Sequence, residues 1–179
     1  MILGSKGIDQ MSEAVSEHKA AADKSVRLAI LTVSDTRTIE TDTSGASIAE
    51  LAEKAGHTVI WRAIVRDEPA EIQAIIDRAT AETSLGALLI TGGTGISPRD
   101  QTVETVEAQF TRSIPGFGEL FRMLSYQEIG PACILSRSTA GLIGRLVVVL
   151  LPGSRAAVQL AMEKILIPEL PHLVREANK

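Results

Sequence analysis

Apolar runs alternate with segments of helical periodicity along most of the chain. Four runs read as strands, at residues 26–33, 57–65, 87–91 and 146–151. Their nearly continuous apolar character is typical of strands buried on both faces of a sheet. Between and after them, apolar residues recur at helical spacing over 48–55, 72–79, 103–110, 120–124 and 158–165. This order predicts an α/β fold, a three-layer α/β/α sandwich with a largely parallel, mixed-edge sheet.

The remaining segments give weaker signals. Gly130-Pro131 should stop a helix, and 132–135 could form a short strand. Residues 168–179 contain two more prolines and end in charged residues, so a tail is expected there. Residues 1–24 are small and polar, which predicts a mobile N-terminal arm ahead of a single domain at 25–179.

Several polar residues have a simple structural interpretation. The candidates for helix N-caps are Asp42, Thr43 or Ser44, then Asp67, Thr102 and Ser154. Capping accounts for one of the first three and leaves the other two available to a ligand. For Asp67, local sequence alone favours the cap. His57 follows a helix-ending glycine and is expected at a strand edge, not as a catalytic base.

The glycine-rich turn after the strand at 87–91 is the strongest local signal. Strand, turn and helix place backbone N–H groups where they can face an anion, beside a helix terminus with about half a positive charge. The turn is neither a Walker loop nor a dinucleotide fingerprint, and a plain turn requiring positive φ is the alternative. Arg99 and Asp100 add a cation and a carboxylate, which favours a site. The turn residues concerned are Gly92, Gly93, Thr94, Gly95 and Ser97.

Polar residues follow each predicted strand. Because the carboxyl ends of parallel strands share one edge, Ser34-Asp35, Arg66-Asp67, Gly92–Asp100 and Pro152-Gly153-Ser154 should converge there. Two or three of the carboxylates Asp35, Asp67 and Asp100 could hold Mg²⁺ together with phosphate oxygens and water. Such a site suits phosphoryl or nucleotidyl transfer, in which positioning and charge neutralisation provide most of the catalysis.

Composition excludes several classes of protein. The net charge of −4, without a basic block, argues against nucleic-acid binding, and one Trp, one Tyr and three Phe are too few for a base-stacking platform. Cys133 is a single cysteine in an apolar context, so a packed thiol is expected. No run approaches the roughly 20 apolar residues of a membrane span, and no signal peptide is visible, so a cytoplasmic location is expected.

Several motifs, taken in order, resemble the MoaB/Mog family of molybdenum cofactor biosynthesis proteins. Four of them are Thr91–Gly95 with Arg99-Asp100, Pro115–Glu119, Ser136-Arg137 and Leu151–Ser154. Two more, Asp42–Gly45 and Phe121–Gly130, look particularly like the MoaB branch. The resemblance extends over about residues 26–166.

The resemblance implies a molybdopterin-binding fold that assembles as a homotrimer or homohexamer. It also implies Mg²⁺- and ATP-dependent adenylylation of molybdopterin, with release of pyrophosphate, before molybdate insertion. By motif, Asp67 and Asp100 correspond to the essential carboxylates and to the Mg²⁺ position. With the residues of the sheet edge, the candidate binding residues are Ser34, Asp35, Asp42, Ser44, Gly92, Gly93, Thr94, Gly95, Ser97, Arg99, Pro115, Gly116, Gly118, Glu119, Ser136, Arg137, Pro152, Gly153 and Ser154.

Two other functions stay open at this stage. The first is a non-catalytic oligomer that binds or carries molybdopterin and hands it to another cofactor-biosynthesis protein. The second is an unrelated nucleotide-binding α/β protein, which would bind ATP without any effect of the pterin. Keeping both Asp67 and Asp100 favours catalysis, because pterin binding alone gains nothing electrostatically from two acids beside a phosphate. Apolar segments at 117–129 and 142–143 are candidate subunit contacts.

Overall fold

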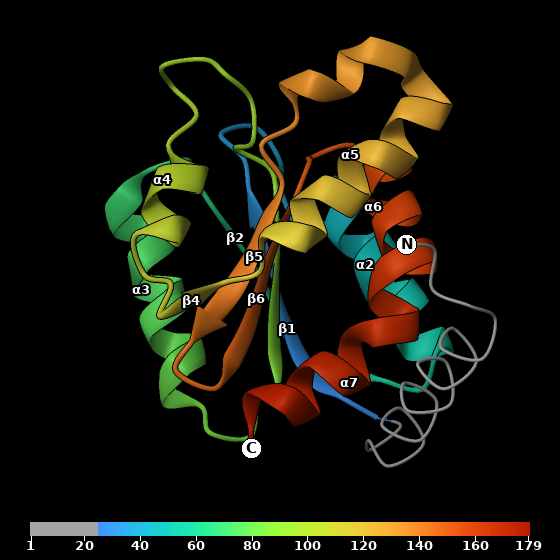
Figure 1. The fold of residues 1–179 in the computed structure, drawn as a ribbon. Helices are drawn as coiled ribbons and strands as arrows, with labels where there is room; N and C mark the ends of the chain where they lie inside the picture. The colour runs from blue at the N-terminus through green and yellow to red at the C-terminus, as the bar shows by residue number, and fades with distance from the viewer. Residues whose placement is uncertain (1–24) are drawn as a thin grey trace, which may run out of the picture.

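The computed structural model describes residues 25–179, which form a six-stranded mixed sheet with helices on both faces (Figure 1). The strand order is β2-β1-β3-β6-β5-β4. Strands β1, β2, β3 and β6 are parallel, whereas β5 pairs antiparallel with β6 and β4 antiparallel with β5. The strands are β1 (Arg27–Val33), β2 (Thr58–Val65), β3 (Ala87–Thr91), β4 (Arg112–Ser113), β5 (Thr139–Ile143) and β6 (Leu146–Leu151). The predicted parallel sheet with a mixed edge is confirmed. The predicted N-terminal arm lies outside the described residues.

Helices α3 and α4 cover one face of the sheet, and α2, α5, α6 and α7 cover the other (Figure 1). Their bounds are α2 (Thr43–Lys54), α3 (Pro69–Ala81), α4 (Thr102–Glu107), α5 (Pro115–Ile129), α6 (Arg155–Ala161) and α7 (Ile167–Ala177). A 3₁₀ helix follows α5, and a π-helical turn joins α6 to α7. Within residues 25–179, none of the helices has the length and apolar character needed to cross a membrane.

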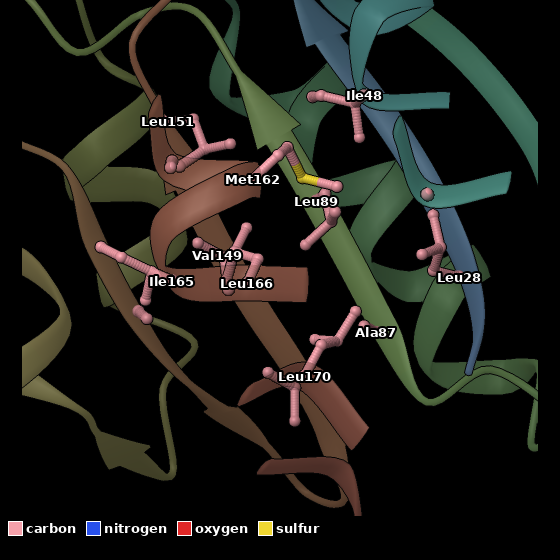
Figure 2. Close-up of a cluster of buried hydrophobic side chains, with 14 of the residues drawn as sticks. Leu28, Ile48, Ala87, Leu89, Val149, Leu151, Met162, Ile165, Leu166 and Leu170 are labelled. Carbon is pink, nitrogen blue, oxygen red and sulfur yellow. The ribbon is translucent and has the colours of Figure 1, made fainter. Parts of the chain in front are cut away.

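Alternating side chains of the central strands fill two separate cores. On β1, Leu28 and Ile30 point to the face covered by α2, α6 and α7, while Ala29 and Leu31 point to α3 and α4. Figure 2 shows the first core, where side chains of β1, β3 and β6 pack under the helices. Every residue of β3 and β6 is buried. Each large buried aliphatic side chain contributes about 1.5–3 kcal/mol, so strands β1, β3 and β6 stabilise the centre of the sheet.

The predicted strands at 87–91 and 146–151 coincide with β3 and β6, and the other two begin one residue late. The predicted strand at 132–135 is wrong, because these residues belong to the 3₁₀ helix Gly130–Leu135. The actual strand is β5, whose Ala-Gly centre carries little strand propensity. It pairs with β6, and Gly141 leaves the room for the Phe110 ring that a Cβ atom would fill.

The expected tail at the C-terminus is also wrong, because α7 runs to Ala177. Pro168 lies in its first turn, where a missing N–H costs nothing, and Leu170 is fully buried against the sheet.

The bounds of α4 and α5 also differ from those that the sequence predicted. Thr102 is the first residue of α4 instead of its cap, and α4 ends before Phe110. Helix α5 begins at Pro115, so the Pro-Gly-x-Gly segment is its first turn.

His57 lies immediately before the edge strand β2 and is 6% exposed. The Val26 N–H donates to its Nδ1 at 3.3 Å, which places the ring proton of the neutral form on Nε2. Nε2 is buried and has no hydrogen-bond partner within residues 25–179. Burial lowers the pKa of His57 because the charged imidazolium would lose its hydration.

The contribution of His57 to the free energy of unfolding should therefore fall on acidification. Below about pH 6.5 the unfolded chain takes up a proton at His57 while the folded chain does not, at a cost of up to about 1.4 kcal/mol per pH unit. Urea denaturation at pH 7.5, 6.5 and 5.5 measures the slope. A His57→Gln variant, which cannot titrate, should show a flatter profile. Equal slopes for the two proteins would contradict this assignment.

Candidate functional site

The turn after β3 is built around two glycines with left-handed backbone conformations. Gly92 has φ +105° and Gly93 has φ +64°. A Cβ atom on Gly92 would collide with the backbone oxygen of Val33, and one on Gly93 with the Thr102 hydroxyl. Both positions therefore require glycine, and the main chain of the turn lies in close contact with Val33 and Thr102.

The same turn presents a run of unpaired backbone donors. Within residues 25–179, the N–H groups of Gly93, Thr94 and Gly95 have no acceptor. They border a cavity of about 290 Å³ at the carboxyl edge of the sheet. Successive N–H groups of this kind form an anion-binding concavity. The cavity is lined by Thr32, Val33, Ser34, Arg37, Asp42, Ser44, Thr91, Gly92, Gly93, Thr94, Gly95, Asp100 and Gly153.

Two hydroxyls tie the loops around this cavity together. Ser44 Oγ donates to the Gly153 carbonyl at 2.9 Å, and Thr91 Oγ1 donates to the Pro152 carbonyl at 2.8 Å. Gly153 also packs on Gly92, since a Cβ atom there would lie 3.3 Å from the Gly92 Cα. The loop after β6 is therefore fixed against the glycine turn and the start of α2.

Asp42 is the N-cap of α2, one of the three candidates from sequence. Its Oδ1 accepts the Gly45 N–H at 2.8 Å, while its Oδ2 accepts from Thr32 Oγ1 and Arg62 Nη2, both at 2.9 Å. The carboxylate is buried and its charge is matched by Arg62. Asp42 thus shapes the cavity wall with few lone pairs left for a ligand.

Asp67 does not cap the helix that follows it, where Glu68 occupies the N-cap position without a side-chain hydrogen bond to the helix backbone. Its Oδ1 accepts instead from the Gln101 N–H at 3.2 Å and from Thr102 Oγ1 at 3.0 Å. Asp67 therefore fixes the start of α4, a helix from another loop. Local sequence could not reveal this contact, because the partners are more than 30 residues away.

The electrostatic setting of Asp67 is unfavourable to its charge. The side chain is 5% exposed, and burial raises its pKa. The bonds from Thr102 and Gln101 oppose that rise, while the nearby charge of Asp100 adds to it. Asp100 accepts the Ser97 N–H at 3.1 Å and lies against Gly95. Two neighbouring carboxylates with one buried form an arrangement that a bound cation would stabilise.

Arg99 joins three loops at the edge of the cavity. Its Nε and Nη2 donate to the two oxygens of Asp35 at 3.2 and 3.0 Å, and its Nη1 donates to the Asp67 carbonyl at 2.9 Å. Nη1 also pairs with Glu68 at 2.9 Å. Both oxygens of Asp35 are therefore occupied by Arg99, and one of them also accepts the Asp67 N–H at 3.3 Å. Asp35 is therefore a poorer candidate for a Mg²⁺ ligand than Asp67 or Asp100.

The structure has a second hollow of about 410 Å³. Pro115, Gly118, Glu119 and Arg137, all predicted site residues, line it together with Arg122 and Ser138. Arg137 Nη2 donates to the carbonyl of Asp100, a residue that lines the first cavity, at 3.1 Å, and this hydrogen bond links the two hollows.

The predicted site residues that line neither hollow are Asp35, Asp67, Ser97, Arg99, Gly116, Ser136, Pro152 and Ser154. Ser136 Oγ pairs with Ser138 Oγ at 3.0 Å beside the second hollow. Ser154 caps α6, as expected, by accepting the Ala157 N–H at 3.2 Å. Gly116 is exposed in the first turn of α5. Cys133 is buried and unpaired, which agrees with a packed thiol.

Within residues 25–179 there is no group of three or more His, Cys, Asp or Glu side chains that could form a metal cage. Asp67 and Asp100 nevertheless fit Mg²⁺, which commonly uses one or two carboxylates and completes its shell with phosphate oxygens and water.

Four residues that line the cavity, Thr32, Val33, Arg37 and Thr91, were not among the candidate binding residues. Thr32 and Thr91 are polar residues at the ends of otherwise apolar strands, a signal that could have identified them. Arg37 gave no such signal, because a single arginine in a polar loop looks like any solvated cation.

Comparison with known proteins agrees with the motifs. The family model of a probable molybdopterin binding domain matches residues 29–172. Molybdenum cofactor biosynthesis protein B of Bacillus subtilis is 49% identical over 166 residues, covering 92% of this chain and 98% of that protein. A crystal structure of a molybdenum cofactor biosynthesis protein B, 48% identical, has a TM-score of 0.85 and covers 88% of this chain and 98% of its own. The tungsten cofactor synthesizing protein MoaB from Pyrococcus furiosus, 35% identical, has a TM-score of 0.79 and covers 88% and 100%. The chain therefore belongs to the MoaB/Mog family of molybdenum cofactor biosynthesis proteins, as its motifs predicted.

Proposed function

We propose that this protein acts in molybdenum cofactor biosynthesis by binding molybdopterin and adenylylating it with MgATP. The names of its relatives support the biosynthetic role. The observation that carries the adenylyltransferase activity is the pair of aspartates, Asp67 against Gly93 and Asp100 against Gly95, beside three backbone N–H groups that have no acceptor within residues 25–179. Acids at this position serve a purpose in phosphate chemistry only if a cation is shared between them and the substrate.

The reaction forms one P–O bond and breaks another. An oxygen of the terminal phosphate of molybdopterin attacks the α-phosphorus of ATP, and pyrophosphate leaves with the electron pair of the broken bond. Mg²⁺, when bound, would offset the negative charge that gathers on the phosphates. The N–H groups of Gly93, Thr94 and Gly95 hold the phosphate oxygens, and the positions of Asp67 and Asp100 are fixed by hydrogen bonds within the protein.

The Asp100→Asn variant tests the reaction. It should lose at least about 100-fold in turnover, because one carboxylate that holds the cation is gone. Purified protein, molybdopterin, ATP and Mg²⁺ are incubated, and mass spectrometry follows the adenylylated pterin and pyrophosphate. Asp77→Asn, an exposed carboxylate on α3, is the matched control and should keep full turnover. Wild-type protein that binds molybdopterin without forming product would point to the carrier function instead.

Two substitutions of Asp67 separate its charge from its hydrogen bonds. Asp67→Ala leaves the Gln101 N–H and the Thr102 hydroxyl unpaired and should lower the free energy of unfolding by about 1–3 kcal/mol. Asp67→Asn keeps an acceptor for both donors and removes the repulsion from Asp100, so its stability should equal or exceed that of the wild type. Urea denaturation at pH 7.5 gives both values, and equal losses in the two variants would contradict the role assigned to the hydrogen bonds.

We also propose that the protein self-associates through α5, as a trimer or a hexamer. The predicted contact segment divides into two sides, since Phe117 and Phe121 are buried in the core. The other side is apolar and exposed, with Met123 56%, Tyr126 59% and Ile129 61% accessible. Burial of such a stripe against another copy of the chain would remove it from water.

Light scattering on the purified protein measures the assembly directly. The wild type should have the mass of three or six chains, and a Met123→Glu/Ile129→Glu double variant should dissociate to a monomer, because two charges would be buried at the contact. Ile39→Glu, on an exposed loop away from α5, should keep the wild-type mass. A monomeric wild type would refute the proposal.

A further inference from the structure

The arginines around the carboxyl edge of the sheet differ in whether their charge is already matched. Four of them form ion pairs with carboxylates of the chain: Arg62 with Asp42, Arg66 with Glu71, Arg99 with Asp35 and Glu68, and Arg137 with Glu104. Arg37 has no carboxylate partner within residues 25–179. It is also the one cation among the described residues that line the cavity of the glycine turn.

We infer that Arg37 is the cation that binds the phosphates of the substrate in this cavity, and that Arg99 is a positioning residue. The inference rests on the proposed function and adds a residue to it. The sequence pointed to Arg99, whose guanidinium is instead committed to two carboxylates and the Asp67 carbonyl. A phosphate could recruit Arg99 only by breaking these contacts, whereas Arg37 has no ion pair to break within residues 25–179.

The loop after β1 holds Arg37 in place without using up its donors. The Arg37 N–H donates to Ser34 Oγ at 3.2 Å, and its Nη1 donates to the Thr41 carbonyl at 2.9 Å. The Thr38 N–H in turn donates to Thr41 Oγ1 at 2.9 Å, which closes the loop. The Nε and Nη2 donors of the fork have no acceptor within residues 25–179. A guanidinium presents donors in a planar fork that suits two phosphate oxygens at once.

The carboxylates that line the cavity make a cation such as Arg37 important for phosphate binding. Of the two lining carboxylates, Asp42 is matched by Arg62 at 2.9 Å, while Asp100 has no basic partner within the described residues. A phosphate ester or polyphosphate would therefore enter a cavity whose unmatched side-chain charge is negative, apart from Arg37. The backbone N–H groups supply only partial charges, so a full positive charge opposite them would decide how strongly the phosphates bind.

Direct binding measurements with Arg37→Gln and Arg37→Lys test the inference. Isothermal titration with ATP and Mg²⁺, and separately equilibrium dialysis with molybdopterin, identify whose phosphate Arg37 holds. The Gln variant should bind at least one of the two ligands about 10- to 100-fold more weakly, as expected for the loss of charge-assisted hydrogen bonds. The Lys variant should recover part of the affinity, since it keeps the charge without the fork.

Thermal unfolding separates binding from folding. Arg37→Gln should leave the Tm within about 1 °C of wild type, because the side chain has no ion pair to lose. Arg99→Gln should lower the Tm, since three loops depend on that guanidinium. Arg145→Gln, an exposed arginine between β5 and β6 at the opposite end of the sheet, removes the same charge and should change neither binding nor Tm.

The outcomes that overturn the inference are distinct from failure of the proposed function. If wild-type protein binds ATP or molybdopterin and Arg37→Gln binds both within twofold of wild type, the inference alone is overturned. The same holds if Arg145→Gln weakens binding as much as Arg37→Gln, which would indicate a general charge effect. Wild-type protein that binds neither ligand overturns the proposed function, and the inference with it.

Discussion

The contact between the Asp67 carboxylate and the first residues of α4 is the interaction on which the candidate site depends. Asp67 follows β2, the edge strand, yet it accepts hydrogen bonds from Gln101 and Thr102 at the far end of the glycine turn. This contact holds the far end of the turn, while the Gly92 N–H, which donates to the Leu151 carbonyl, holds the end that leaves β3. Arg99 adds a second anchor by binding the Asp67 carbonyl from the same segment. Both contacts join the far end of the turn to the loop that follows β2.

This arrangement places the buried carboxylate of Asp67 close to Asp100, which lowers the stability of the folded protein. Burial and the charge of Asp100 both raise the pKa of Asp67, so the ionised pair lowers the stability of the free protein. A structural hydrogen-bond acceptor could have been a neutral side chain. Local conflict with stability of this kind is usual where residues serve a ligand.

The sequence predicted those parts of the fold that rest on continuous burial. Strands β3 and β6 are found where expected because each is apolar throughout and buried on both faces. Strand β5 was missed because its Ala-Gly centre is stabilised by pairing with β6 and by the Phe110 ring, neither of which is local. The incorrect prediction of a strand at 132–135 has the opposite cause. Residues 134–135 are apolar but exposed, so their apolar character did not indicate burial in the sheet.

The candidate site divides in the same way. Convergence of the strand ends was predictable from topology, and the cavity collects the glycine turn with Ser34, Ser44, Asp100 and Gly153. The partners of individual charges were not predictable, because each comes from a different loop. Arg99 looked like the phosphate cation and Asp67 like a local cap, and both are engaged across the sheet edge instead.

The ties between Ser44 and Gly153, and between Thr91 and Pro152, join residues 109 and 61 positions apart. The cavity therefore cannot close until β6 has emerged and entered the sheet between β3 and β5. Contacts of such long range form late and slowly in folding, because the intervening chain must be ordered first. Ligand-binding capacity should accordingly arise in one step with the completed sheet, and a nascent chain that stops short of β6 would hold the aspartates and the glycine turn without a pocket between them.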